Sequence, residues 1–319
     1  MQNKLIVSSS PHIHTRESTR RIMWLVIISL IPAGLSGIYI FGLSALRTIM
    51  LGITSALISE LLLQILFKRK NTILDGSAFL TGLLLSYNLP ANTPFWLPIA
   101  GSFFAIAIGK FVFGGLGQNI FNPALAGRAF LVASWPKYMT AFTLPAYAKG
   151  WLNYDAITQA TPLALIKKGK ALIDTTYLDL FLGNKSGCIG EVCILALILG
   201  AAFLFLKGYI SWHIPFPYII TVGLLAYIFG PKGYFSGDWL SHILSGGLIL
   251  GAFFMATDYV TSPLTRKGQV FFGIGCGLIT IVIRLWGGTS EGVCYSILMM
   301  NAAAPIIDRY TKSRIYGTR

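Results

Sequence analysis

The sequence has few charged residues. Asp, Glu, Lys and Arg make up 11% of its 319 residues, whereas soluble domains carry about 25%. Hydrophobic residues account for 55% of the chain. A soluble globular domain is therefore excluded, and the composition indicates an integral membrane protein.

Acidic residues are scarcer than basic ones: 11 Asp and Glu stand against 25 Lys and Arg, a formal net charge of +14. Such an excess is also typical of nucleic-acid-binding proteins. Here, however, the basic residues lie at the ends of apolar runs, as in Arg20-Arg21 and Lys68-Arg69-Lys70, where they anchor at lipid headgroups. We therefore expect no nucleic-acid partner.

Motifs for metal clusters and nucleotides are missing. The four cysteines, Cys188, Cys193, Cys276 and Cys294, form no Cys-x-x-Cys pair, so we expect buried thiols and no iron–sulfur centre or other metal site. The glycine-rich residues 114–119 lack the Lys-Ser/Thr ending of a phosphate-binding loop. No acid/base constellation is evident either, so the chain has no complete active site of its own.

Long apolar segments are what the sequence does have. They lie at residues 22–42, 47–67, 73–90, 95–113, 120–136, 191–207, 214–230, 237–257, 269–286 and 290–307. Several approach the ~20 residues that cross a bilayer. We therefore predict an all-α polytopic membrane protein with about ten transmembrane helices. The polar residues 1–21 show no cleavable signal peptide.

The basic residues predict the orientation. A cytoplasmic N-terminus places most cations of the short loops and tails inside, as the positive-inside rule requires. Those cations are Arg16, Arg20, Arg21, Lys68, Arg69, Lys70, Lys110, Lys207, Arg266, Lys267, Arg309, Lys312 and Arg314. We expect a multi-pass protein of the cell (inner) membrane, with both the 1–21 segment and the 308–319 tail in the cytoplasm. Residues 137–190 then form an external loop.

A faint internal repeat divides the chain in two. Residues 77–84 (SAFLTGLL) resemble residues 241–248 (SHILSGGL), and Phe-Gly-Gly at 113–115 resembles Trp-Gly-Gly at 286–288. Each half, 22–136 and 191–307, has an odd number of predicted spans, so the second copy lies upside down relative to the first. We predict two inverted five-helix repeats.

The longest polar interruption contains residues 155–162, Asp-Ala-Ile-Thr-Gln-Ala-Thr-Pro. Aspartate and threonine beside proline commonly form a capped turn, and that alternative stays open from these residues alone. Aromatic and basic residues surround the stretch, as an isoalloxazine ring and its phosphate require, although an interfacial aromatic belt with a basic rim has the same composition. These residues are Trp135, Tyr138, Phe142, Tyr147, Trp151, Tyr154, Lys167, Lys168 and Lys170.

Together with other motifs, this stretch resembles a known family. The other motifs lie at residues 75–82 (DGSAFLTG), 113–124 (FGGLGQNIFNPA), 183–191 (GNKSGCIGE), 211–215 (SWHIP), 253–263 (FFMATDYVTSP) and 291–293 (EGV), with Asn301. They are similar to those of the RnfD/NqrB family, which comprises the D subunits of the Rnf ferredoxin:NAD+ oxidoreductases and the B subunits of the Na+-translocating NADH:quinone reductases. The resemblance spans nearly the whole chain and implies a duplicated ten-helix bundle.

The resemblance also implies cofactors. The family's flavinylation motif is Asp-x-x-(Ser/Thr)-Gly-Ala-Thr, matched here by Asp155, Thr158, Ala160 and Thr161, with Gln159 in place of glycine. It implies that a flavin transferase joins FMN to Thr161 through a phosphoester. It further implies a non-covalent riboflavin in the membrane part.

The implied function is that of an electron-carrying subunit in a complex that moves Na+ or H+. Its partners are then other Rnf subunits, membrane and peripheral, including a second flavinylated subunit and iron–sulfur subunits. Two alternatives stay open: a component like the B subunit of the NADH:quinone reductase, and a urea-channel-like solute pore, because that class shares the fold.

Ionisable and amide side chains within apolar segments are candidate ion or flavin contacts. Glu60 lies inside the second segment, while Asn119 and Asn122 adjoin a short, broken fifth segment. Glu60 is equally compatible with a pair to a cation of a neighbouring subunit, and the two asparagines with a helix break satisfied inside the bundle. Asp75, Glu191, Asp238 and Asp258 lie at segment ends, where helix caps are the simpler interpretation.

Overall fold

Helices form most of the computed structural model, which describes residues 17–69, 71–143, 145, 160–167, 176–230 and 233–312. The first half contains α1 (Thr19–Phe41), α2 (Leu43–Leu66), η1 (Ile73–Asp75), α3 (Ser77–Tyr87), α4 (Trp96–Ile106) with its π-helical continuation η2 (Ala107–Phe111), α5 (Pro123–Ser134) and α6 (Pro136–Met139). Between the halves lie α7 (Pro162–Lys167) and α8 (Tyr177–Leu182).

The second half contains α9 (Ile194–Leu206), α10 (Pro215–Ile228), α11 (Trp239–Leu244), α12 (Leu248–Leu250) with the π-helical η4 (Gly251–Met255), α13 (Arg266–Trp286) and α14 (Val293–Tyr310). A two-stranded antiparallel ribbon, β1 (Phe229–Gly230) and β2 (Gly233–Tyr234), follows α10.

Nine of the ten predicted apolar segments each contain a helix whose bounds agree within a few residues, when η2 is counted with α4; the exception is segment 237–257. Three helices, α1, α2 and α13, are long and apolar enough to cross a membrane by themselves, and five shorter helices are also apolar. The prediction of a helical polytopic membrane protein is confirmed at this level.

Local sequence explains where several helices begin. Ser18 accepts a hydrogen bond from the backbone of Arg21 and caps α1, and Thr265 caps α13 by accepting from Gly268. Asn122 caps α5, with Pro123 in the first turn, where a missing N–H costs nothing.

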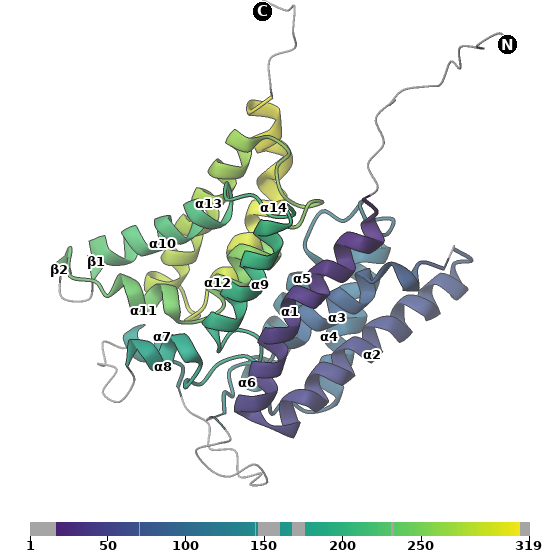
Figure 1. Cartoon of the computed structure of the whole chain (residues 1–319), viewed down its shortest axis with the longest axis horizontal. Coiled ribbons are helices and arrows are strands. Elements are labelled where there is room, and N and C mark those ends of the chain that lie inside the picture. The colour runs from purple at the N-terminus through teal and green to yellow at the C-terminus, as the bar shows by residue number, and fades with distance from the viewer. Residues whose placement is uncertain are drawn as a thin grey trace, which may run out of the picture.

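The helices form two lobes that meet along α1 and α9 (Figure 1). In the first lobe α2 packs against α3 and α4, and α4 against α5. In the second lobe α10 packs against α11 and α13, and α13 against α14. The start of α1 and the end of α14 lie at the upper edge of Figure 1, and α6, α7 and α8 lie at the lower edge.

The eighth predicted segment, 237–257, is not one continuous helix. It breaks between α11 and α12, where Ser245 is extended and Gly246 adopts a φ of +70°. A left-handed backbone favours glycine. The break lies inside the protein, because Ser241, Ser245 and Leu248 on its two sides are buried. Irregular backbone at such a depth is tolerated where protein surrounds it.

The C-terminal end of the predicted external loop 137–190 packs inside the helix bundle. Residues 185–190 are buried, and the backbones of Ile189 and Gly190 donate to the carbonyls of Leu89 (3.1 Å) and Tyr87 (2.9 Å). Hydropathy misses this segment because its polar residues are buried with their partners.

A glycine permits the close approach of α2 and α3. A Cβ added to Gly82 would lie 2.6 Å from the carbonyl oxygen of Gly52 and 2.9 Å from Ala56 Cβ. We expect Gly82→Leu to separate the two helices and to destabilise the fold by roughly 1–3 kcal/mol or more. The measurement is the thermal midpoint of the protein in detergent, with Gly288→Leu, where a Cβ meets nothing within 4 Å, as the control. Equal midpoints for the two variants would contradict this packing.

Candidate functional site

Thr161 lies immediately before α7. Its side chain is partly exposed, and its hydroxyl oxygen accepts a hydrogen bond from the backbone N–H of Ala164 (3.3 Å). The carbonyl of the exposed Ala160 accepts from the hydroxyl of Ser186 (3.2 Å), which ties the motif to the segment before α9. Asp155 and Thr158, the other predicted motif residues, lie outside the described part of the chain.

Two contacts fix α7 to the second lobe. Leu163 is buried beside Gly246. Lys167 Nζ donates to the carbonyls of Gly287 and Thr289 (2.8 Å to the latter), just after α13. A cation at a helix C-terminus is stabilised by the unpaired carbonyls there. Partial burial lowers the pKa of Lys167 below its usual value.

A cavity of about 350 Å³ opens beside α7; we call it the α7 cavity. Its lining combines three basic side chains with aromatic and apolar ones. The lining residues are Leu163, Ile166, Lys167, Phe229, Gly230, Gly233, Tyr234, His242, Arg284, Leu285, Trp286 and Ser290.

Arg284 is the most buried of the basic groups of the α7 cavity, with 2% of its surface exposed. Its terminal nitrogens donate to the carbonyls of His242 and Ser245, at the break between α11 and α12. Among the described residues, its Nε and the Nδ1 of His242 have no hydrogen-bond partner. Buried polar atoms without partners cost free energy.

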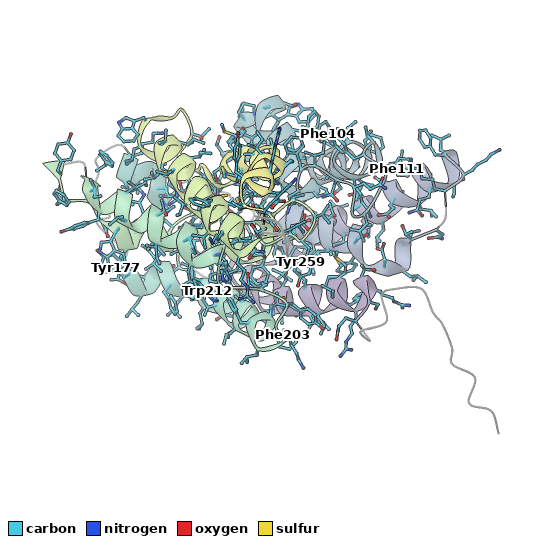
Figure 2. All side chains as sticks on the ribbon, turned by 90° about the horizontal axis from the view of Figure 1, so that it is seen from above. Phe104, Phe111, Tyr177, Phe203, Trp212 and Tyr259 are labelled. Carbon is cyan, nitrogen blue, oxygen red and sulfur yellow. The ribbon has the colours of Figure 1, made fainter. Side chains whose placement is uncertain are left out.

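A second cavity, here called the central cavity, lies between the two lobes. Its lining comes from α1, α3, α5, α9 and η4 and the adjoining loops, and it includes Asn119 and Asn122. The exposed Tyr259 also lines it and lies near the centre of the molecule seen from above (Figure 2).

Both asparagines are held by the protein itself. Asn122 Oδ1 caps α5 by accepting from the backbone of Ala124 (3.1 Å), and its Nδ2 donates to the carbonyl of Met255 (3.3 Å). Asn119 Nδ2 donates to the carbonyl of Phe121 (3.0 Å). The interpretation of this region as a helix break satisfied inside the bundle is confirmed.

Glu60 pairs with a cation of its own chain. Lys110 Nζ donates to both of its carboxylate oxygens at 2.8 Å and to Ser77 Oγ at 2.7 Å. Gln64 and Thr72 donate to Glu60 Oε1 as well. Both partners are buried. Glu60 therefore pairs with Lys110 of its own chain, on the π-helical η2, rather than with the cation of a neighbouring subunit that was considered from the sequence. A role for Glu60 as an ion contact stays a prediction.

A second ion pair, between the buried Arg128 and the partly buried Glu291, joins the two lobes. Arg128 of α5 donates to Asn88 (2.5 Å) and to Glu291, which lies just before α14. Glu191, at the head of α9, lies beside this pair. Sequence reasoning assigned Arg128 no role and counted Lys110 among the cations of the cytoplasmic loops and tails, whereas Lys110 is buried in the pair with Glu60. The signal was present, because each is a basic residue within or beside an apolar segment and there demands a partner.

The cysteines form no disulfide. Cys188, Cys276 and Cys294 are buried and Cys193 is partly buried. The prediction of buried thiols is confirmed for those three.

Comparison with known proteins gives matches over nearly the full length. Residues 6–317 match the model of the NQR2, RnfD, RnfE family. The chain is 51% identical to the D subunit of the Na+-translocating ferredoxin:NAD+ oxidoreductase complex of Acetobacterium woodii, over 98% of this chain and 95% of the relative. It is 48% identical to the D subunit of the proton-translocating ferredoxin:NAD+ oxidoreductase complex of Clostridium ljungdahlii, over 100% and 98% of the two chains. The D subunit of an ion-translocating oxidoreductase complex of Stutzerimonas stutzeri is 40% identical, over 95% and 93% of the two chains.

Proposed function

The chain belongs to the NQR2, RnfD, RnfE family, and we propose that it is an electron-carrying membrane subunit of an Rnf-type ferredoxin:NAD+ oxidoreductase that couples electron flow to Na+ or H+ translocation. The observation that carries this proposal is the identity of 51% and 48%, over nearly full length, to two relatives named as the D subunits of such complexes. One relative is named for Na+ and the other for protons, so both ions belong to the proposal.

We propose that FMN is attached to Thr161. Three observations support this: the hydroxyl is partly exposed, it lies next to the α7 cavity through Leu163 and Lys167, and basic side chains line that cavity. Lys167, His242 and Arg284 would hold the phosphate and the electron-rich edge of the ring, while Phe229 and Trp286 supply flat apolar faces. When bound, a flavin supplies the capacity to accept and pass on electrons.

We further propose that the central cavity takes the non-covalent riboflavin. Its lining is largely apolar, with the polar groups Asn119, Asn122, Lys110 and Asp258. The cavity measures about 100 Å³, so a ring enters only after exposed lining residues such as Tyr259 turn outward.

A substitution that fills the central cavity should displace this flavin. Leu80 lines the cavity, and Leu80→Trp should remove most of the acid-extractable flavin while leaving the protein-bound flavin in the pellet. Leu199→Trp, on an exposed face, is the matched control. The measurement is chromatography of the extract from purified complex. Unchanged extractable flavin in Leu80→Trp would place the riboflavin elsewhere.

The finer architecture is also proposed. Ten crossings arranged as two inverted five-helix repeats are supported by the equivalent packing of α2 with α3 and α4 and of α10 with α11 and α13. The start of α1 and the end of α14 lie on one side of the molecule, as expected if both tails are in the cytoplasm of a cell with this protein in its inner membrane.

The partners follow from the proposed complex. Ferredoxin and NAD+ would be handled by other subunits, iron–sulfur and flavinylated ones among them, and a flavin transferase would modify Thr161. The names of the relatives favour this role over a component of the NADH:quinone reductase and over a solute pore.

The test of the function is electron transfer in inverted membrane vesicles. Vesicles from cells lacking this chain should not form NADH from reduced ferredoxin, and the restored chain should recover both NADH formation and ion uptake into the vesicles. Loss of ion uptake in the presence of a sodium ionophore would identify Na+ as the transported ion, and loss in the presence of a protonophore would identify H+. NADH formation at the full rate without the chain would refute the proposal.

A further inference from the structure

Buried polar atoms without hydrogen-bond partners gather at one place in the described part of the chain. Besides His213, the residues with such atoms are Glu191, His242, Ser245 and Arg284. Arg284 contacts the carbonyls of His242 and Ser245, and Glu191 lies beside the nearby Gly247. They therefore surround the break between α11 and α12, where the two lobes meet.

Two carboxyl groups meet at this break. Glu291 Oε1 accepts from the backbone N–H of Gly247 (2.7 Å), and its Oε2 accepts from Arg128. Glu191 Oε1 accepts from the backbone N–H of Cys188 (3.0 Å), while its Oε2 has no partner. A Cβ on Gly247 would lie 2.7 Å from Glu291 Oε1 and 2.8 Å from Glu191 Oε2. Glycine at 247 thus leaves the space in which the two carboxyl groups approach each other.

If both carboxyl groups are ionised, the pair contains only hydrogen-bond acceptors and no donor. Glu291 Oε1 and Glu191 Oε2 both lie beside one point, the position that a Cβ on Gly247 would take, and carboxylate oxygens only accept. Two adjacent carboxylates that are largely shielded from water also repel, so such pairs retain one proton between them. A proton on Glu191 Oε2 converts the atom without a partner into a donor toward Glu291. Arg128 and the Gly247 N–H then stabilise the remaining negative charge on Glu291.

The other ionisable groups around the pair have separate partners or are thiols. Lys185 donates to the carbonyl of Leu244, and Arg284 donates to the carbonyls of His242 and Ser245. The groups facing the pair are Arg128 of α5, Lys185 and Cys188 before α9, Arg284 of α13 and Cys294 of α14.

We propose that Glu191 and Glu291 form a proton-binding site that holds one exchangeable proton between the two lobes. The site is adjacent to α7, which follows Thr161: Leu163 of α7 lies beside Gly246, and the next residue, Gly247, donates to Glu291. If a flavin occupies the α7 cavity, an electron added to it would place negative charge nearby and strengthen the hold on the proton. This last step rests on the proposed attachment of FMN at Thr161; the proton site itself does not.

The test is infrared difference spectroscopy of the purified complex, which resolves the carbonyl stretch of a protonated carboxyl group. The wild type at neutral pH should show such a band, shifted by transfer to heavy water and by carboxyl-carbon isotope labelling of glutamate. Glu191→Gln and Glu291→Gln should each remove it, because the amide donates the missing hydrogen bond and the remaining glutamate ionises. Glu17→Gln, at an exposed carboxylate paired with Arg21, should retain it.

The outcomes are distinct. A wild-type spectrum without a glutamate carbonyl band, or a band that survives both Glu191→Gln and Glu291→Gln, would overturn the proton site. The isotope-labelled wild type tests the proton site even if a variant fails to assemble.

The link to the flavin has its own test. Chemical reduction should shift the band in flavinylated protein and not in Thr161→Ala. A band that is present but unmoved by reduction, in protein whose mass shows bound FMN, would overturn the link to the flavin alone. A mass without FMN would instead refute the attachment.

Discussion

Thr161→Ala is expected to abolish the covalent flavin completely. The phosphoester requires the side-chain hydroxyl, which alanine lacks, and no residue of the adjoining α7 carries one. In denaturing gels viewed under ultraviolet light, wild-type protein made with its transferase should fluoresce and the variant should not. NADH formation from reduced ferredoxin should fall to the level of vesicles without the chain.

Two control variants separate the loss of the Thr161 hydroxyl from a general effect of substitution on folding. Thr140→Ala removes an exposed hydroxyl that bonds only within its own turn, and it should leave fluorescence unchanged. Thr161→Ser keeps a hydroxyl and should retain a detectable band. Fluorescence of full intensity in Thr161→Ala would assign the attachment to another residue and would contradict the proposal that the covalent flavin lies in the α7 cavity.

Lys110→Met is expected to destabilise the first lobe severely. It leaves the Glu60 carboxylate buried at 2% exposure with hydrogen bonds from Gln64 and Thr72 but no counter-charge. Removing one partner of a buried ion pair costs about 3–5 kcal/mol. The midpoint of thermal unfolding in detergent and the yield of monodisperse protein should both fall strongly.

The double variant Glu60→Met with Lys110→Met sharpens this test. Replacing both partners by apolar side chains is often close to neutral, so most of the lost stability should return. Lys207→Met, at an exposed helix end, is the control and should change the midpoint little. A double variant as unstable as Lys110→Met alone would show that the pair is not the reason for the loss.

The helices followed from the sequence because bilayer thickness and hydrophobicity leave few alternatives. The residue patterns around Asn122-Pro123 also indicated a helix break before α5, which the capping geometry confirms. The family resemblance supplied the candidate attachment site, and the comparisons support the family. Asp155 and Thr158 lie outside the described residues, so their part in the motif stays a prediction.

The polar interior did not follow from the sequence. Glu60 and Lys110 are 50 positions apart, and Arg128 and Glu291 are 163 apart. A hydropathy analysis assigns such charged residues to the ends of membrane spans. In the structure, each pair instead forms only through contacts between distant segments. The same reason hid the burial of residues 185–190: their polar groups face Leu89, Tyr87 and Leu244, and no local pattern encodes those partners.

Fragmentation mass spectrometry of the tryptic peptide 150–167 tests the central claim most directly. Cleavage after Lys149 and Lys167 isolates a peptide whose hydroxyl-bearing residues are Tyr154, Thr158 and Thr161. Protein purified from a host with the flavin transferase should give this peptide with the added mass of one FMN less one water, and the fragments should assign that mass to Thr161. An unmodified peptide from such a host, or an added mass on Thr158 or Tyr154, would contradict the account.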